Sequence, residues 1–343
     1  MLVASLLTLG SPEQLTGGYL YHRRVADLAP AHGARLDLVS LPDLPFPLPA
    51  ALAPRLLRRV RDSDVVVVDS IAAAYLAPWR PGPPLVAVLH QPPGGIDHGP
   101  LRRSLQAALD RALYRRCALL LLAADALAGP WLPPVPTAVV APGRNAGPPP
   151  EGPPLDLRRG RRSALLSVGN WVPRKGALDL LEAFAPLPRD LATLHLVGRT
   201  DIDRRYGRRV SARLARPDLA GRVVVHGPVH PDRMGGLYRA ADVFVLPSYS
   251  DPYGTVYGEA MAAGLPVVGW RAGNLPNLAD HDREGLILEP GDRPALTAAL
   301  GRLAADADDR ARLAAAAAAR AQALPTWDDT AARFVELLAG VAR

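Results

Sequence analysis

Cysteine, lysine and long apolar runs are nearly missing from this sequence of 343 residues. The single cysteine, Cys117, excludes a disulfide framework, and its place in the apolar run CALLLLA indicates a buried residue rather than a nucleophile. That run ends at Asp125, so no stretch approaches the ~20 apolar residues that span a bilayer. The first residues, MLVASLLTLG, also lack the basic region of a signal peptide. We therefore expect a cytoplasmic protein in a reducing compartment.

Aromatic residues make up only 5% of the chain, whereas basic residues exceed acidic ones and give a formal net charge of +7. Most of this excess lies before residue 163. The scarcity of aromatic side chains among these arginines argues against a nucleic-acid partner. A nucleotide, an anionic acceptor and a weak peripheral contact with a membrane remain open, and a solvated arginine-rich surface is the simplest interpretation.

The length of the chain suits two domains, and a hydrophobic content of 49% allows each to bury a core. Short apolar runs, such as Val65–Val68 and Leu85–Leu89, alternate with segments of helical spacing, which is typical of parallel sheets covered on both faces. Residues 143–160 are rich in proline and glycine and predict a linker. We therefore predict an α/β fold with domains at residues 1–150 and 151–325, and a closing helix at 326–343 that packs back on the first domain.

The stretch from Asp242 to Asp292 carries the clearest chemical pattern. Val243–Leu246 is a short apolar run that ends at Pro247, which predicts a buried strand. A loop of turn-forming residues follows. Helical spacing then begins near Tyr253 and stops at Gly264, and a further strand begins at residue 267.

The junction between this loop and helix predicts an anion site. Gly254 allows the backbone to approach a ligand closely, and Thr255 opens the helix with free N–H groups, which suits a phosphate. Asp251 lies at the end of the loop. Glu259, two turns into the helix, would lie beside the phosphates, where its natural partner is a ribose diol.

These residues resemble the signature of glycosyltransferase family 4, the retaining enzymes of the GT-B fold that use nucleotide sugars. The resemblance rests on GEAMAAGLPVV, which contains Glu259, and on EGLILEPGD at 284–292. Asp251 stands where the family usually has Glu, and Asn274 and Asn277 replace a usual Gly and Glu. The resemblance implies two Rossmann-like domains with parallel sheets facing a central cleft. It also implies that the first domain binds the acceptor and the second binds the donor.

Lys175 is the only lysine of the chain and lies in the loop GNWVPRKG. The loop is similar to a family loop whose lysine binds the donor diphosphate, and an ammonium suits a phosphate oxygen on which charge develops. The family's arginine in this loop is Asn170 here, and Arg174 could take its place. His90 follows the strand Leu85–Leu89, at the end where open α/β sheets bind ligands, and the resemblance implies that it reaches the donor sugar.

The predicted site residues fall into three groups. Catalytic roles are expected for His90, Lys175 and Asp251. The expected donor-binding residues are Gly18, Asn170, Arg174, Lys175, His226, Pro228, Asp251, Tyr253, Gly254, Thr255 and Glu259. Acceptor contacts are expected from Tyr19, His22 and His98. Gly17-Gly18 could equally be a plain turn, and the side chains of Tyr19 and His22 could simply pack. Asp201-Ile-Asp203 has the spacing of a metal-binding Asp-x-Asp motif, but the same spacing recurs by accident at Asp62-Ser-Asp64. We therefore predict no metal site, and we also predict no cofactor.

The resemblance implies a metal-independent, retaining transfer of a hexosyl group from a nucleotide-diphosphate sugar to a small-molecule or lipid acceptor. A UDP-sugar is the expected donor and a GDP-sugar the alternative. Two other functions remain open. Asn170, Asp251 and Asn277 motivate a nucleotide-sugar-binding protein without transfer activity, and a GT-B sugar-nucleotide epimerase would share the same fold.

Overall fold

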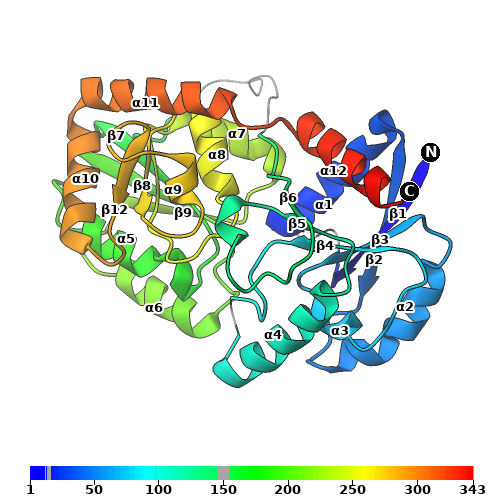
Figure 1. Cartoon of the computed structure of the whole chain (residues 1–343). Helices are drawn as coiled ribbons and strands as arrows, with labels where there is room; N and C mark the ends of the chain where they lie inside the picture. Colours follow the sequence, from blue (N-terminus) through cyan, green and yellow to red (C-terminus); the bar gives the residue numbers. More distant parts are fainter. Residues whose placement is uncertain (12, 14–16, 97, 145–154, 343) are drawn as a thin grey trace. The chain divides into compact units, whose positions relative to one another are not determined.

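The computed structural model describes residues 1–11, 13, 17–96, 98–144 and 155–342. The chain divides into unit 1, Met1–Gly143 with Pro325–Arg343, and unit 2, Arg144–Leu324. The boundary predicted between residues 150 and 151, with much of the predicted linker, lies outside the described residues. The last helix, α12 (Trp327–Val341), is part of unit 1 and packs against α1 (Gly17–Leu28) (Figure 1).

Unit 1 is built on a six-stranded parallel sheet in the order β2-β1-β3-β4-β5-β6. Its strands are β1 (Leu2–Leu9), β2 (Ala34–Leu41), β3 (Val65–Asp69), β4 (Leu85–Leu89), β5 (Leu119–Leu122) and β6 (Thr137–Val139). Its helices, besides α1 and α12, are α2 (Ala53–Arg59), α3 (Ala73–Leu76) and α4 (Pro100–Tyr114). The strand order reverses between β1 and β3, and the carboxyl ends of strands at such a switch point are where open sheets bind ligands.

Two helix boundaries in unit 1 differ from the prediction. The proline-rich sequence of residues 44–54 predicts a loop, but a 3₁₀ turn at Leu48–Leu52 leads directly into α2 at Ala53. The sequence also predicts a helix that starts at Leu105, but α4 begins earlier, at Pro100. Proline occupies the first turn of both helices, where its missing N–H breaks no hydrogen bond. The prediction treated these prolines as loop residues and therefore placed both helix starts too late.

Unit 2 is built on a second six-stranded parallel sheet in the order β12-β11-β10-β7-β8-β9. Its strands are β7 (Ser163–Val168), β8 (Ala192–Val197), β9 (Val223–Gly227), β10 (Val243–Leu246), β11 (Val267–Trp270) and β12 (Gly285–Leu288). Its helices are α5 (Ala177–Phe184), α6 (Arg204–Leu214), α7 (Pro231–Ala240), α8 (Thr255–Ala262), α9 (Leu275–Leu278), α10 (Arg293–Ala305) and α11 (Ala307–Gln322). The order reverses between β7 and β10, which lie side by side.

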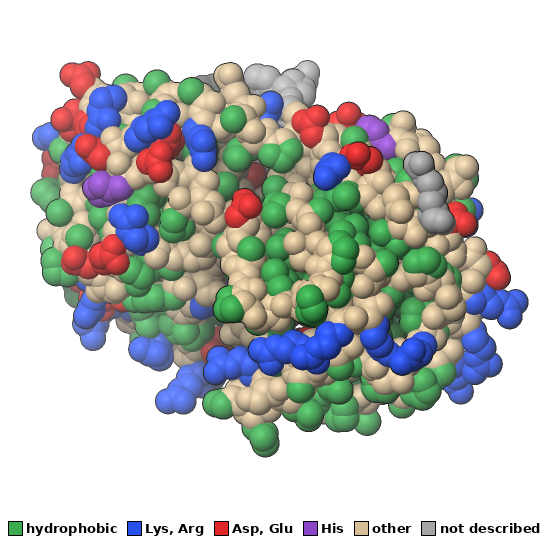
Figure 2. Space-filling model, viewed as in Figure 1, with side chains coloured by type: hydrophobic (Ala, Val, Ile, Leu, Met, Phe, Trp, Pro, Cys, Tyr) green, Lys and Arg blue, Asp and Glu red, His purple; other side chains and the backbone are tan. Residues whose placement is uncertain are grey.

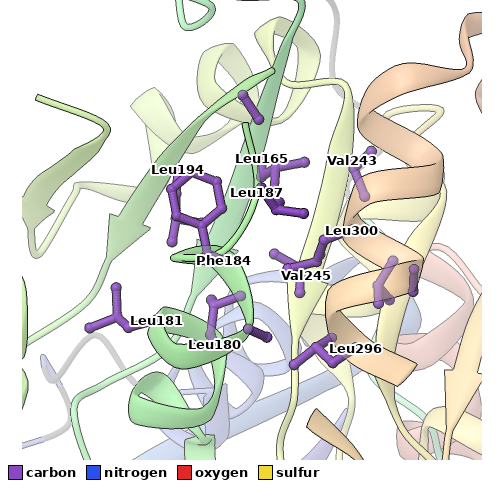
Figure 3. Close-up of a cluster of buried hydrophobic side chains, with 14 of the residues drawn as sticks. Leu165, Leu180, Leu181, Phe184, Leu187, Leu194, Val243, Val245, Leu296 and Leu300 are labelled. Atoms are coloured by element: carbon purple, nitrogen blue, oxygen red, sulfur yellow. The ribbon is translucent and has the colours of Figure 1, made fainter. Parts of the chain in front are cut away.

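Both faces of this second sheet are buried. Leu165 and Leu166 are neighbours on β7 and fully buried, yet they belong to different apolar clusters because successive side chains of a strand point to opposite faces. Figure 3 shows the cluster that contains Leu165, where Phe184 of α5 and Leu300 of α10 pack against the strands. Each such side chain contributes roughly 1.5–3 kcal/mol of hydrophobic free energy. The predicted α/β fold with parallel sheets is confirmed.

Candidate functional site

The chemical groups of unit 2 converge at its switch point. Lys175 follows β7, Asp251 follows β10, and these two strands are hydrogen-bonded neighbours. The Nζ atom of Lys175 lies 2.7 Å from Oδ2 of Asp251. Strand order therefore brings together two predicted site residues that are far apart in the sequence.

The ion pair between Lys175 and Asp251 is mostly shielded from solvent, with side-chain exposures of 14% and 12%. Burial alone would raise the pKa of Asp251, but the ammonium of Lys175 outweighs it, and the pKa lies below its usual value. The carboxylate is therefore ionised at neutral pH. Such a pair offers a fixed positive charge that a bound phosphate can share.

Backbone turns with little room for side chains hold the two loops together. Gly176 has a φ of 68°, and a Cβ atom there would lie 2.1 Å from the carbonyl oxygen of Pro247. The carbonyl oxygen of Arg174 accepts from the backbone N–H of Tyr249 at 2.7 Å, and its guanidinium donates to the carbonyl of Ser250 at 3.1 Å. Arg174 thus joins the loop after β7 to the loop after β10.

The N-terminus of α8 lies beside this ion pair. Gly254 precedes the helix with a φ of 68°, and its N–H donates to Oδ1 of Asp251 at 3.4 Å. The Oγ1 atom of Thr255 is buried and has no hydrogen-bond partner among the described residues. A buried hydroxyl without a partner costs free energy unless a ligand satisfies it. Together with the first N–H groups of α8, this hydroxyl could bind an anion, and the anion site stays a prediction.

The two asparagine departures from the family pattern support the loop that carries Asp251. Asn274 donates its backbone N–H to the carbonyl oxygen of Asp251 at 2.9 Å and its side-chain amide to the carbonyl of Tyr253 at 3.1 Å. Asn277 in turn donates to Oδ1 of Asn274 at 2.9 Å. A Cβ atom on Gly273 would lie 2.5 Å from the same carbonyl of Asp251, so this turn lies directly on the loop.

Glu259 lies on α8 and is half-buried, and the hydroxyl of Tyr238 on α7 donates to its Oε2 atom at 2.9 Å. Burial, with the nearby carboxylate, raises the pKa of Tyr238 well above its usual value, so the phenol keeps its proton and donates it to the carboxylate. Tyr238 therefore fixes the carboxylate of Glu259. No sequence pattern singles out this tyrosine, because its partner lies on another helix.

The other predicted donor residues lie near the carboxyl ends of β7 and β9, which are separated in the sheet by β8. Asn170 follows β7, and its Oδ1 atom accepts from the N–H of Arg199 at 3.0 Å. The apolar run 223–225 predicts a strand that ends at Val225, but β9 runs through Gly227 and includes His226. The Nε2 atom of His226 is 2.9 Å from Nδ1 of His195. Pro228, immediately after this strand, is exposed.

In unit 1, Gly18 and His90 lie together, since a Cβ atom on Gly18 would be 3.5 Å from the His90 ring. Tyr19 donates its hydroxyl to the carbonyl of Leu9, and burial raises its pKa to about 12. His98 packs against the turn at Gly95.

His22 requires a correction. It was predicted to contact an acceptor, but its side chain is only 1% exposed and is hydrogen-bonded to Asp69 at 2.9 Å. The structure therefore places it beneath the surface. Asp69 ends the strand of four valines, and its sequence position gave no hint that it pairs with a residue of α1.

One set of described residues has the composition of a metal site, namely His22, Asp69 and His90, whose ligand atoms lie within 4.8 Å of one another. The carboxylates of Asp201 and Asp203, by contrast, both have partners within the protein. Asp201 pairs with Arg199, and Asp203 caps α6 by accepting from the N–H of Tyr206. The absence of a metal from the reaction stays a prediction.

Comparison with known proteins identifies the type of domain in unit 2. Residues 162–306 match the sequence model of the family Glycosyl transferases group 1. D-inositol 3-phosphate glycosyltransferase of Xylanimonas cellulosilytica is 35% identical over 175 residues, which are 51% of this chain and 42% of that protein. The GDP-mannose-dependent alpha-(1-6)-phosphatidylinositol monomannoside mannosyltransferase of Mycobacterium tuberculosis is 28% identical over 192 residues, which are 53% and 49%. The chain thus spans less than half the length of these relatives.

Solved structures match along nearly the whole chain. HepE of Anabaena, in complex with UDP and glucose, has a TM-score of 0.80 at 19% identity and covers 98% of this chain and 99% of its own. Sucrose-phosphate synthase of Thermosynechococcus elongatus has a TM-score of 0.83 at 20% identity, with 99% of each chain covered. The predicted GT-B fold is therefore confirmed. No described helix combines the length and the apolar character that crossing a membrane requires.

Replacing Lys175 by Met tests the ion pair. We expect the free energy of unfolding to fall by about 2–4 kcal/mol at neutral pH, because Asp251 would remain buried without its cation. Denaturant titration measures this loss. The wild-type pKa of Asp251 is depressed, so the pair stabilises the fold above the unfolded pKa of the carboxyl, and this stabilisation is lost as pH falls through the folded pKa.

The difference between the Lys175→Met variant and wild type should therefore shrink toward about pH 4, where the unpaired carboxyl becomes protonated. Adding Asp251→Asn to Lys175→Met is the matched control, and it should recover part of the loss at neutral pH. An equal loss at both pH values would contradict the ion-pair interpretation.

Proposed function

We propose that this chain, whose residues 162–306 form a glycosyl transferases group 1 domain, moves a sugar from a nucleotide-diphosphate sugar to an acceptor. One observation carries the proposal. The buried pair of Lys175 and Asp251 lies at the switch point of unit 2, next to a helix N-terminus where the hydroxyl of Thr255 has no hydrogen-bond partner within the described part of the chain. A cation, a helix dipole and a free hydroxyl on one side of a loop suit a diphosphate.

In the proposed reaction, Glu259 binds the ribose diol of the nucleotide, held in place by Tyr238. Lys175 and the backbone N–H groups at Gly254 and Thr255 bind the diphosphate. As the bond from the sugar C1 to the phosphate oxygen breaks, negative charge grows on that oxygen, and these preorganised donors stabilise it. The reaction then needs no metal, because the cation and the helix dipole are already in place.

The same proposal covers retention of configuration. The acceptor oxygen forms its bond to C1 on the face that the phosphate leaves, and the acceptor proton passes to the departing phosphate oxygen. No side chain then has to act as a general base. Asp251, which is one methylene shorter than the usual Glu, lies close enough to Lys175 to contact the sugar beside the diphosphate.

The donor and the acceptor are inferred from relatives. HepE was solved with UDP and glucose, which supports a UDP-sugar, while the mannosyltransferase named above uses GDP-mannose, which keeps a GDP-sugar as the alternative. The relatives named for inositol phosphate and phosphatidylinositol support a polyol acceptor, either free or on a lipid. A binding protein without transfer activity and an epimerase are the rivals. Turnover with an acceptor would exclude the first, and donor isomerisation without an acceptor would support the second.

A surface of unit 1 favours the lipid form of the acceptor. On α4, Leu101 is 87% exposed and Leu105 is 52% exposed, and the intervening Arg102 and Arg103 are exposed as well. Figure 2 shows basic side chains in a band across the part of unit 1 where Figure 1 places α4. Exposed leucines on either side of two arginines suit an anionic membrane surface.

The first test is a thermal-shift screen against nucleotide sugars and free nucleotides in the presence of a chelator. We expect one diphosphate nucleotide and its sugar to raise the melting temperature. At a ligand concentration of a hundred times Kd, binding raises the free energy of unfolding by about 2.7 kcal/mol. Glu259→Gln should weaken this binding by about 10- to 100-fold because it removes a charged acceptor of the diol. Tyr238→Phe, which keeps the carboxylate, should weaken it less. No response to any nucleotide would favour a protein that does not use nucleotide sugars.

Lys175→Ala should lower kcat by about 10²- to 10³-fold while weakening nucleotide binding much less, because its charge matters most as the leaving group forms. Lys175→Arg, which keeps the charge but not the compact shape, is the matched control and should retain intermediate activity. Steady-state kinetics and nucleotide titration separate the two effects. Equal losses in binding and rate would contradict the role assigned to Lys175.

Leu101→Glu should reduce binding to vesicles of anionic lipid by about tenfold, because it places a charge where an apolar side chain would enter the interface. Co-sedimentation measures the bound fraction. Ile202→Glu, at an exposed apolar position of unit 2, is the control and should leave binding unchanged. Equal binding by wild type and the Leu101 variant would argue for a soluble acceptor.

A further inference from the structure

Three polar side chains form a buried chain at the switch point of unit 1. Oδ2 of Asp69, at the end of β3, lies 2.9 Å from Nε2 of His22 on α1. The same nitrogen lies 3.1 Å from Nε2 of His90, which follows β4. Asp69 and His22 are each 1% exposed and His90 is 9% exposed, so water cannot supply their hydrogen bonds freely.

Asp69 is held as an anion by a full set of donors. Its Oδ2 atom also accepts from the hydroxyl of Thr8 at 2.9 Å, and its Oδ1 atom accepts from the hydroxyl of Ser70 and the N–H of Ile71, both at 3.2 Å. Burial alone would raise the pKa of Asp69, but His22 outweighs it and lowers the pKa to about 2. The carboxylate therefore has only lone pairs to offer.

This assigns the proton of His22. The ring nitrogen that faces the carboxylate must carry a hydrogen, so His22 is protonated at Nε2. Its Nδ1 atom is buried and has no hydrogen-bond partner among the residues that the structure describes.

The tautomer of His90 follows from that of His22. Because Nε2 of His22 carries a hydrogen, Nε2 of His90 at 3.1 Å must face it with a lone pair, and the proton of a neutral His90 ring lies on Nδ1. Burial, followed by the neighbouring His22, lowers the pKa of His90 to about 3, despite Asp69. Tyr21 adds to this burial, since its ring packs edge-on against His90 at 5.2 Å while its hydroxyl donates to the carbonyl of Val140.

We propose that Asp69 and His22 are positioning residues that hold His90 as a neutral imidazole in its Nδ1–H tautomer. A ring fixed in this way acts on a substrate as a polar group of one orientation and does not exchange protons during turnover. The assignment of the tautomer stands on the geometry alone. Its consequence for turnover rests on the proposed function, together with the contact of His90 with the donor sugar that the family resemblance implies.

The tautomer can be measured on the full chain with ¹⁵N-labelled histidine, by the couplings of each ring nitrogen to its carbon-bound protons. His22→Gln and His90→Gln identify the two sets of signals. We expect His90 in the wild type to show a protonated Nδ1 and an unprotonated Nε2, unchanged between about pH 5.5 and 8. A proton on Nε2 of His90, or titration of His90 in this range, would overturn the proposal.

Asp69→Asn should remove the preference for one tautomer. An amide can donate to His22 as well as accept from it, so the proton of His22 can then lie on either ring nitrogen. His90 should then show both tautomers. Thr8→Val is the matched control, since it removes one donor to Asp69 but keeps the charge, and it should leave the tautomer of His90 unchanged. If Asp69→Asn does not fold, the wild-type spectrum still decides the question.

The alternative to the proposal is that a metal ion binds His22, Asp69 and His90 in place of the proton between them. Stoichiometric Zn²⁺ in the purified chain, lost in His22→Gln and accompanied by a change of the His90 signals on chelation, would overturn the proposal.

Activity gives the second readout. With a donor and acceptor in hand, Asp69→Asn should lower kcat at least tenfold with little change in the KM of the donor, and kcat should become dependent on pH where the wild type is not. A parallel rise in KM would indicate a merely structural role. If no transfer is found with any acceptor but the His90 tautomer is as expected, the proposed function fails and the tautomer assignment stands.

Discussion

The ion pair between Lys175 and Asp251 constrains the arrangement of unit 2 more than any other polar contact of its site. Two charges that are mostly shielded from water are stable only if they meet, so the loops after β7 and β10 must lie within one hydrogen bond of each other. Gly176 allows this approach, because any side chain there would collide with the carbonyl of Pro247. The position of α8, and with it Glu259, follows from where that loop ends.

Both units place their charged groups at the point where the strand order reverses. At such a point two neighbouring loops leave the sheet in opposite directions and uncover the carboxyl ends of their strands, so polar side chains there can face one another. In unit 1 the pair is Asp69 and His22, and in unit 2 it is Asp251 and Lys175. In each unit one carboxylate follows a buried strand and is kept ionised by a basic partner.

The sequence predicted the strands better than the helix starts, for a physical reason. The strands Leu85–Leu89 and Val243–Leu246 were predicted to the residue, because a strand buried on both faces is a continuous apolar run with sharp ends. Helices α2 and α4 have proline in their first turn, where the sequence pattern predicted a loop. Glu259 and Lys175 could be singled out from motif and composition. Asp69 and Tyr238 could not, because their partners lie on other elements and no spacing reveals them.

The different charges of the two sites agree with the different demands of the proposed transfer. Negative charge develops on the leaving diphosphate, so a permanent cation is useful beside the nucleotide, where Lys175 lies, and a titrating group there would weaken the site as pH changes. At the sugar, a group that lost or gained a proton would compete with the transfer of the acceptor proton to the phosphate. A neutral ring fixed by a buried carboxylate avoids this competition. The anion of Asp69 is thus compatible with the chemistry because His22 lies between it and His90.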